Sequence, residues 1–310
     1  MVTLQQLRYF RELAATGHLT RTAEKLHITQ TSLSNTIIHM EKQLGLKLFQ
    51  RVGRTLELSE IGKVYLGYVE EALSALDNAQ TVVDDYLDRD NNTISISMSS
   101  SHVWTTLIRN FRMEYRDYHI RQVNCTRLQY RDLLISQDTD FVIAGTDDLL
   151  LNGLEYTILR KEKLYLCVYR DHPLASRKSI CLEEARNESF INLSETESFR
   201  IFCDNLFERV GISPSASIEC DYTMRGKLIE AGFGVALTTG RSIDMGMLGS
   251  NVFIPLSDDF AVRPIAIIWN PKHYLGKAAR DFLRYTVNTE SKQDPGKEAV
   301  KNVSSQANEG

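Results

Sequence analysis

A short run of hydroxyl and amide side chains near the N-terminus is the first feature with a defined chemistry. It consists of Gln30, Thr31, Ser32, Ser34 and Asn35. In a helical repeat these residues share one face, while Leu33 and Ile37 turn toward a core. Gln and Asn can form two hydrogen bonds to an adenine edge, and Ser and Thr can bond bases or phosphates. The run therefore predicts an uncharged surface that contacts the edges of DNA bases.

Basic and polar residues on both sides of this run are suited to phosphate contacts. Arg51 and Arg54 follow it, and Thr20 and Arg21 precede it. Residues 1–58 hold eight Lys/Arg and four acidic residues, so this segment is +4 in a chain whose net charge is −4. A basic module on an acidic body is expected when only one part of a protein meets phosphate. The alternative is that these polar side chains only cap helices and solvate the surface.

Three helices and a hairpin are predicted to position these residues. Residues 4–15 form the first helix, and Gly17 ends it. Thr20 is a candidate N-cap for the second helix, and Thr29 or Thr31 for the third, which Gly45 ends. Two β-prone runs, 46–51 and 55–58, flank a glycine turn and predict a small hairpin. Three helices followed by such a hairpin are typical of a winged helix-turn-helix.

A long uninterrupted helix is predicted from Ser59 to about Arg89. Its apolar residues recur at steps of three and four: Ile61, Tyr65, Tyr68, Ala72, Ala75, Ala79, Val83 and Tyr86. Such a heptad-like stripe is too long for a small N-terminal module to bury. It predicts that the helix pairs with a second copy of itself to form a homodimer.

The remaining sequence alternates between strand and helix patterns. Strands are expected at 94–98, 120–125, 140–145, 164–169, 189–193, 217–221, 234–239 and 263–269, with helices between them and a last helix from Leu275 to about Thr289. This alternation favours parallel sheets covered by helices on both faces. The strands suffice for two lobes, joined near Leu164 and near Pro264. The polar segment 290–310 is predicted to be a disordered tail.

Several classes of protein are disfavoured by what the sequence lacks. Five widely spaced cysteines form no CxxC pair or His/Cys cluster, so neither a metal site nor a cofactor is expected. No apolar run is long enough to cross a membrane, and the N-terminus does not resemble a signal peptide, so a cytoplasmic location is expected. No nucleophile, phosphate-binding or zinc-protease motif indicates an enzyme. An enzyme without a known motif and a two-lobed solute-binding protein remain as alternatives.

Several segments resemble one known family. These are QLRYF at 6–10, LTRTAEKLHITQTSLSNTI at 19–37, MEKQLGLKLFQR at 40–51 and LSEIG at 58–62. In this order and spacing they resemble the N-terminal signature of the LysR-type transcriptional regulators. Three further segments resemble the body of that family: DFVIAG at 140–145, DHPLA at 171–175 and EAGFGVAL at 230–237. Thr31, Thr22 and Ser59 depart from the family pattern, which usually has Pro, Ala and Thr at these places.

The resemblance implies an α+β multidomain fold. A winged helix-turn-helix DNA-binding domain would span residues 1–58, and a linker and dimerisation helix 59–90. A two-lobed effector-binding domain similar to periplasmic solute-binding proteins would span 91–289, with lobe 1 at 93–163 and 264–289 and lobe 2 at 164–263. The implied function is that of a sequence-specific transcriptional regulator controlled by a small effector. The implied assembly is a homodimer through the linker helix and a homotetramer.

The resemblance also assigns roles to residues. The polar run from Gln30 to Asn35 would face the major groove of double-stranded DNA, and Arg51 and Arg54 would bind its backbone. The effector would lie between the lobes, at strand ends and helix N-termini, where small ligands commonly bind. The candidate effector contacts are Ser100, Ser101, His102, Thr146, Ser194, Thr196 and Thr238. Because free N–H groups at a helix start attract negative charge, an anionic effector is favoured.

Overall fold

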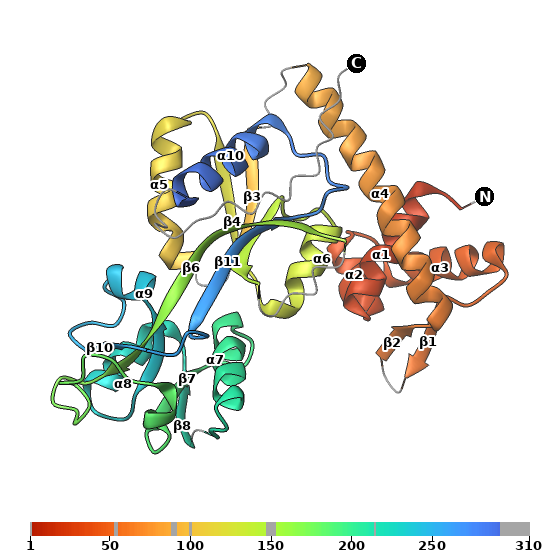
Figure 1. The fold of residues 1–310 in the computed structure, drawn as a ribbon. Coiled ribbons are helices and arrows are strands. Elements are labelled where there is room, and N and C mark those ends of the chain that lie inside the picture. The colour runs from red at the N-terminus through yellow and green to blue at the C-terminus, as the bar shows by residue number, and fades with distance from the viewer. Residues whose placement is uncertain are drawn as a thin grey trace. The chain divides into compact units, whose positions relative to one another are not determined.

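The computed structural model describes residues 2–52, 55–87, 92–98, 101–146, 153–213 and 215–291. They group into two compact units. The first comprises residues 1–91 with the short segments 135–137 and 272–276, and the second comprises the rest. Figure 1 labels the elements of each unit. None of the described helices combines the length and the apolar character needed to cross a membrane.

Three helices make up most of the first unit: α1 (Leu4–Thr16), α2 (Leu19–Lys25) and α3 (Gln30–Leu44). Thr29 caps α3, as predicted, because its hydroxyl accepts the N–H of Ser32 at 3.1 Å. The prediction that Thr20 caps α2 is wrong. The helix begins at Leu19, two residues earlier than a cap at Thr20 would place it, and His18 occupies the cap position without a side-chain hydrogen bond.

A hairpin follows α3, formed by the antiparallel strands β1 (Phe49–Val52) and β2 (Thr55–Leu58). Its base is held by Glu41, whose side chain is only 5% exposed. One carboxylate oxygen of Glu41 accepts the backbone N–H groups of Leu48 and Phe49, at 2.9 and 3.2 Å. The other pairs with the Lys47 ammonium at 2.6 Å. A buried carboxylate needs such partners. Glu41 therefore links the last turn of α3 to the β1–β2 hairpin, which is the wing of the predicted winged helix-turn-helix.

The core of the first unit lies between these helices, the hairpin and α4 (Glu60–Tyr86). Its buried apolar residues are Phe10, Leu13, Ala23, Leu33, Ile37, Met40, Leu48, Phe49, Val69 and Leu73. The Phe10 ring meets Phe49 and Tyr65 edge-on, at centroid distances of 5.4 and 5.6 Å. Tyr65 therefore packs partly against this core, so this residue of the predicted stripe also serves the first unit.

Lobe 1 of the second unit is built from β3 (Thr93–Met98), β4 (His119–Asn124) and β5 (Phe141–Gly145) with their helices. The helical elements are η1 (Ser101–Trp104), α5 (Thr105–Glu114), η2 (Arg127–Gln129), α6 (Tyr130–Ile135) and α10 (Lys277–Ser291). Alternate β5 residues face opposite layers. Phe141 meets Phe282 of α10, and Val142 packs with Tyr130 of α6. Figure 1 shows α5 and α10 together on one side of β3, and the Phe111 and Phe282 rings of these helices lie 5.0 Å apart.

Lobe 2 contains β7 (Ser189–Leu193) and β8 (Ser215–Cys220), which pair in parallel, and β9 (Ala236–Thr239) and β10 (Val252–Pro255). Its helices are η3 (Leu182–Ala185), α7 (Ser198–Arg209), α8 (Tyr222–Glu230) and α9 (Gly240–Asp244). The buried rings of Phe190 and Phe207 join β7 to α7 at 4.7 Å. Ile191, next to Phe190 in β7, belongs to a separate buried cluster with Cys167, because adjacent residues of a strand face opposite sides.

Two long strands, β6 (Glu155–Val168) and β11 (Val262–Trp269), connect the lobes. They pair antiparallel from Glu155 to Lys163, and from Leu164 onward β6 pairs with β9 and β10 instead. The seven-stranded sheet runs β10-β6-β11-β5-β3-β4, with β9 also paired to β6. One strand thus belongs to both lobes.

This topology corrects the expectation of parallel sheets. β3 is parallel to β4 and β5, but β11 is antiparallel to both β5 and β6. The chain passes from lobe 1 to lobe 2 along β6 and returns along β11, so the two strands must run in opposite directions. The sequence pattern missed residues 155–163 of β6 and all of β10. The last helix extends to Ser291, and residues 292–310, which hold most of the predicted tail, lie outside the described residues.

Candidate DNA-binding surface and ligand cleft

The first turns of α3 present the predicted polar run to solvent. Gln30, Thr31, Ser32 and Asn35 are exposed and Ser34 is half-buried, whereas Leu33 and Ile37 are in the core. The α-helical repeat separates the two groups because apolar residues at i and i+4 share one face. The surface is uncharged and small enough to lie against base edges.

Thr20 and Gln30 bring the starts of α2 and α3 together. The Thr20 hydroxyl donates to the Gln30 side-chain oxygen at 3.2 Å. This hydrogen bond occupies the amide oxygen of Gln30 and leaves its NH₂ group to donate outward. Arg21 beside it is exposed.

The wing carries the remaining predicted contacts. Arg51 is exposed in β1, opposite Leu56 of β2. Arg54 lies outside the described residues. Because Glu41 anchors the base of the hairpin, Arg51 projects from an element that is fixed to α3.

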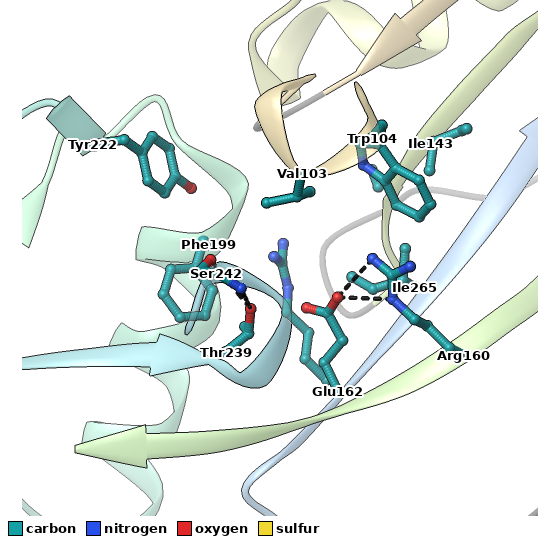
Figure 2. A pocket seen from close by; sticks show the side chains of 12 residues that line it. Val103, Trp104, Ile143, Arg160, Glu162, Phe199, Tyr222, Thr239, Ser242 and Ile265 are labelled. Atoms are coloured by element: carbon teal, nitrogen blue, oxygen red, sulfur yellow. Dashed lines mark hydrogen bonds and ion pairs between the residues drawn. The ribbon is translucent and has the colours of Figure 1, made fainter. Parts of the chain in front are cut away.

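In the second unit, a partly open cleft lies beside the two crossover strands. Figure 2 shows side chains from both lobes around it, including Trp104 and Ile143 from lobe 1 and Phe199, Tyr222, Thr239 and Ser242 from lobe 2. Arg160, Glu162, Arg263 and Ile265 line it from β6 and β11. Glu162 is in register with Arg263, and Arg160 with Ile265, so all four project from one face of the paired strands.

Arg160 is the centre of a buried charge network in this cleft. Its guanidinium donates to Glu162 at 2.8 Å and pairs with Glu290 of α10. The indole ring of Trp104 covers the guanidinium at 4.3 Å. Two carboxylates and one ring therefore compensate the loss of water around this cation.

Arg263 and Glu197 complete the polar surroundings. The guanidinium of Arg263 donates to the Ser198 hydroxyl and packs so closely on Gly145 that a Cβ there would lie 2.7 Å from it. Burial raises the pKa of Glu197, although the positive charges of Arg263 and Arg225 oppose this rise. The cleft is therefore built mainly around arginines and aromatic rings.

None of the predicted effector contacts with a described side chain is among the residues that line this cleft. Ser100 lies outside the described residues, and Ser101 and His102 have a described backbone only, in η1. Thr146 follows β5, and its N–H donates to the Pro264 carbonyl at 3.2 Å. Ser194 and Thr196 lie in the turn before α7 with their hydroxyls 3.3 Å apart. Thr238 is completely buried, and its hydroxyl has no hydrogen-bond partner among the described residues.

The alternation of strand side chains explains the difference at Thr238. Adjacent residues in a strand face opposite sides, so a shift of one residue exchanges the two faces. Thr239 lines the cleft and Thr238 does not. Arg160, Glu162 and Arg263 were not predicted from the sequence. The run from Arg160 to Lys163 is charged at every position, so no alternation indicates which of its side chains face the cleft.

Comparisons with known proteins identify both units. Residues 4–63 match the family model described as "Bacterial regulatory helix-turn-helix protein, lysR family", and residues 88–290 match that of the LysR substrate binding domain. The chain is 30% identical to the transcriptional dual regulator GltC of Bacillus subtilis (strain 168), over 93% of this chain and 98% of that protein.

Solved structures share the fold. A full-length OxyR variant from Pseudomonas aeruginosa aligns with a TM-score of 0.69 at 21% identity, covering 94% of this chain and 95% of that one. Full-length CbnR in complex with its target DNA aligns with a TM-score of 0.55 at 20% identity, covering 93% and 99%. The two family models and the GltC match together leave one assignment: the chain belongs to the LysR family of bacterial helix-turn-helix transcriptional regulators.

Proposed function

We propose that this LysR-family regulator contacts its operator with the first turns of α3 and is controlled by a small molecule bound between the lobes. Gln30, Thr31, Ser32, Ser34 and Asn35 face the bases. Thr20, Arg21, Arg51 and Arg54 bind phosphates. The observation that supports this most directly is the exposed, uncharged polar surface at the start of α3.

The proposed assembly is a homodimer formed through α4, and a tetramer built from two dimers. Support for the dimer comes from apolar side chains exposed along α4. Tyr68 is 70% exposed, Val64 57% and Leu76 49%. A row of exposed apolar residues on a long helix is typical of a helix that pairs with another.

The proposed effector site is the cleft lined by Trp104, Arg160 and Phe199. It combines aromatic walls with a few buried polar groups, which is the usual composition of a small-molecule site. An effector that binds one arrangement of the lobes more tightly shifts the population toward it. We propose that this shift changes the geometry of the paired DNA-binding modules, and with it the energy of bending the operator.

We further propose that the protein acts in the cytoplasm and has no enzymatic activity. The support is the family, because the helix-turn-helix model is that of bacterial regulatory proteins and GltC is a transcriptional regulator. The domain division 1–58, 59–90 and 91–289 is part of the same proposal. An enzyme or a solute-binding protein on the same two-lobed body is the competing function, and neither requires the surface at the start of α3.

The decisive experiment is fluorescence anisotropy of the full chain on duplex DNA from upstream of its own gene, at several salt concentrations. Wild type is expected to bind with a dissociation constant of about 10⁻⁸ M or lower. Gln30→Ala is compared with Gln43→Ala, which removes the same amide from an exposed position in the last turn of the same helix. Only Gln30→Ala is expected to lose preference over random DNA. Ser34→Ala, at the half-buried member of the surface, is expected to weaken this preference as well.

The wing is tested in the same assay. Arg51→Ala is expected to reduce the salt slope by about one unit without changing sequence preference, because one phosphate contact is lost. Arg116→Ala removes an exposed arginine from the second unit and is expected to leave the slope unchanged. Equal effects of Gln30→Ala and Gln43→Ala, or no binding to any duplex at low salt, would contradict the proposed DNA-binding surface.

A further inference from the structure

A second cavity, partly open to solvent, lies in lobe 2. Asn192 of β7, Arg200 of α7 and Arg225 of α8 contribute its polar side chains, and apolar residues form the remaining walls. Phe199 lines both this cavity and the cleft between the lobes, so one ring separates the two spaces.

The two arginines of this cavity differ in whether a carboxylate balances their charge. Arg200 is neutralised, since its guanidinium pairs with Asp204 at 2.8 Å and Glu219 at 3.5 Å and donates to the Leu193 carbonyl. Arg225 is more deeply buried, with 3% exposure, yet no described carboxylate lies within ion-pair distance of it. Its Nε has no hydrogen-bond partner among the described residues.

Aromatic rings lie beside the Arg225 guanidinium, and the Glu197 carboxylate feels its charge from beyond ion-pair distance. The central carbon of the guanidinium lies 5.8 Å from the centre of the Phe199 ring and 5.4 Å from that of Tyr222. Such contacts offset part of the cost of removing a cation from water, but they do not replace a counter-ion. A buried guanidinium without a carboxylate partner is therefore a site where an external anion would be strongly favoured.

The side-chain amide of Asn192 is a second polar group that can bind an anion in this cavity. The residue is 7% exposed and lines the same cavity. No hydrogen bond of its side chain is found in the described part of the chain. Its NH₂ group can donate to the same oxyanion that pairs with a guanidinium.

We propose that Arg225 and Asn192 bind the carboxylate of the effector, a small organic acid. Phe199 and Tyr222 then contact its apolar body toward the cleft. This inference rests on the proposed function, because it names the chemical class of the molecule that the two lobes bind. It also places the anion in lobe 2, and not at the helix start near Ser100 that the sequence favoured.

The test uses the intrinsic fluorescence of the full chain during thermal unfolding. The sequence has two tryptophans, Trp104 and Trp269, and both belong to the second unit, so the signal does not report anions bound to the first unit. The probes are sodium acetate, succinate and phenylacetate. Acetamide, succinamide and phenylacetamide serve as uncharged controls at the same ionic strength.

Wild type is expected to gain about 2 to 4 °C in Tm with at least one anion and nothing with its amide. Arg225→Met is expected to abolish this gain and to raise the Tm without anion, because an uncompensated buried charge is removed. Asn192→Asp is expected to do the same by supplying an internal carboxylate. Arg209→Met is the matched control, since Arg209 also lies over a ring in lobe 2, that of Phe260, but outside the cavity.

An unchanged gain in Arg225→Met, or no anion-dependent gain in wild type, would overturn the proposal. If Arg225→Met folds poorly, Asn192→Asp decides alone, because it keeps the size of the side chain. The thermal-unfolding experiment contains no DNA, and the anisotropy experiment above contains no small molecule. Failure of the anion site is thus distinguishable from failure of the DNA-binding function.

Discussion

The position of Cys167 in the fold determines how reactive its thiol is. The thiol lies in β6 with 0% exposure, packed in the layer that contains Ile191, Ile229 and Leu248. Burial raises its pKa to about 12, although the positive charge of Arg225 works in the opposite direction. The thiolate is the reactive form of cysteine, so this residue is kept in its unreactive form at neutral pH.

Cys167 is therefore expected to resist alkylation in the native protein. At pH 8, four units below a pKa of about 12, only about one thiol in ten thousand is ionised. The ionised fraction increases as the pH rises toward that pKa. Iodoacetamide pulses at pH 8, followed by mass spectrometry, measure the rate. The same peptide should react fully in urea, and rapid native labelling of Cys167 would contradict the expected burial.

At the scale of an element, α4 is positioned by one glycine near its start. A Cβ on Gly62 would lie 2.1 Å from the Leu48 carbonyl oxygen, so the helix can approach the segment before the wing only without a side chain there. Ser59 supports the same contact, because its N–H donates to that carbonyl at 2.8 Å and its hydroxyl caps the helix. A Cβ on Gly67, about one and a half turns later, would meet nothing within 4 Å.

The two glycines predict opposite effects of the same substitution. Gly62→Ala is expected to destabilise the first unit by about 2 kcal/mol or more, because the backbone must shift to relieve the overlap. Gly67→Ala is expected to stabilise the helix by about 1 kcal/mol, the usual difference between Gly and Ala inside a helix. Hydrogen exchange of α4 and hairpin peptides in the full chain measures both. Similar protection in the two variants would contradict the close approach at Gly62.

At the scale of the whole molecule, α4 has two apolar faces with different uses. Val69 and Leu73 are buried in the first unit, at 3% and 2% exposure, whereas Tyr68 and Leu76 remain exposed at 70% and 49%. Predicted stripe residues Ile61, Ala72, Ala75, Ala79 and Val83 are also exposed. The inner face is satisfied within one chain, so the outer face is available to a second copy.

Tyr68→Glu is expected to weaken the proposed dimer because it places a charge in the centre of the outer face. Sedimentation velocity at micromolar concentration should show a shift toward monomer, and operator affinity should fall with it. Gln80→Glu adds the same charge to an exposed position on the flank of the helix and should sediment like wild type. A Tyr68→Glu variant that remains fully dimeric would exclude this face as the interface.

Local patterns in the sequence determined much of this protein. Helical spacing placed Leu33 and Ile37 in the core and the polar run outside, and Thr29 capped α3 as predicted. Strands such as Ser189–Leu193 and helices such as Tyr222–Glu230 were predicted closely, because period and end signals depend only on neighbouring residues. The family-like segments along residues 6–62 and in the body carried the family assignment.

Only the tertiary structure decided how the cleft is lined. Arg160, Glu162 and Arg263 come together because β6 and β11 pair antiparallel between the lobes, and their register depends on residues about 100 positions apart. Arg225 resembles a surface charge in the sequence, and its burial appears only when α8 packs against β7. Partners distant in the chain set burial and register, so the sequence determined most of the elements and the polar face of α3, whereas the fold determined which charged side chains line the cleft.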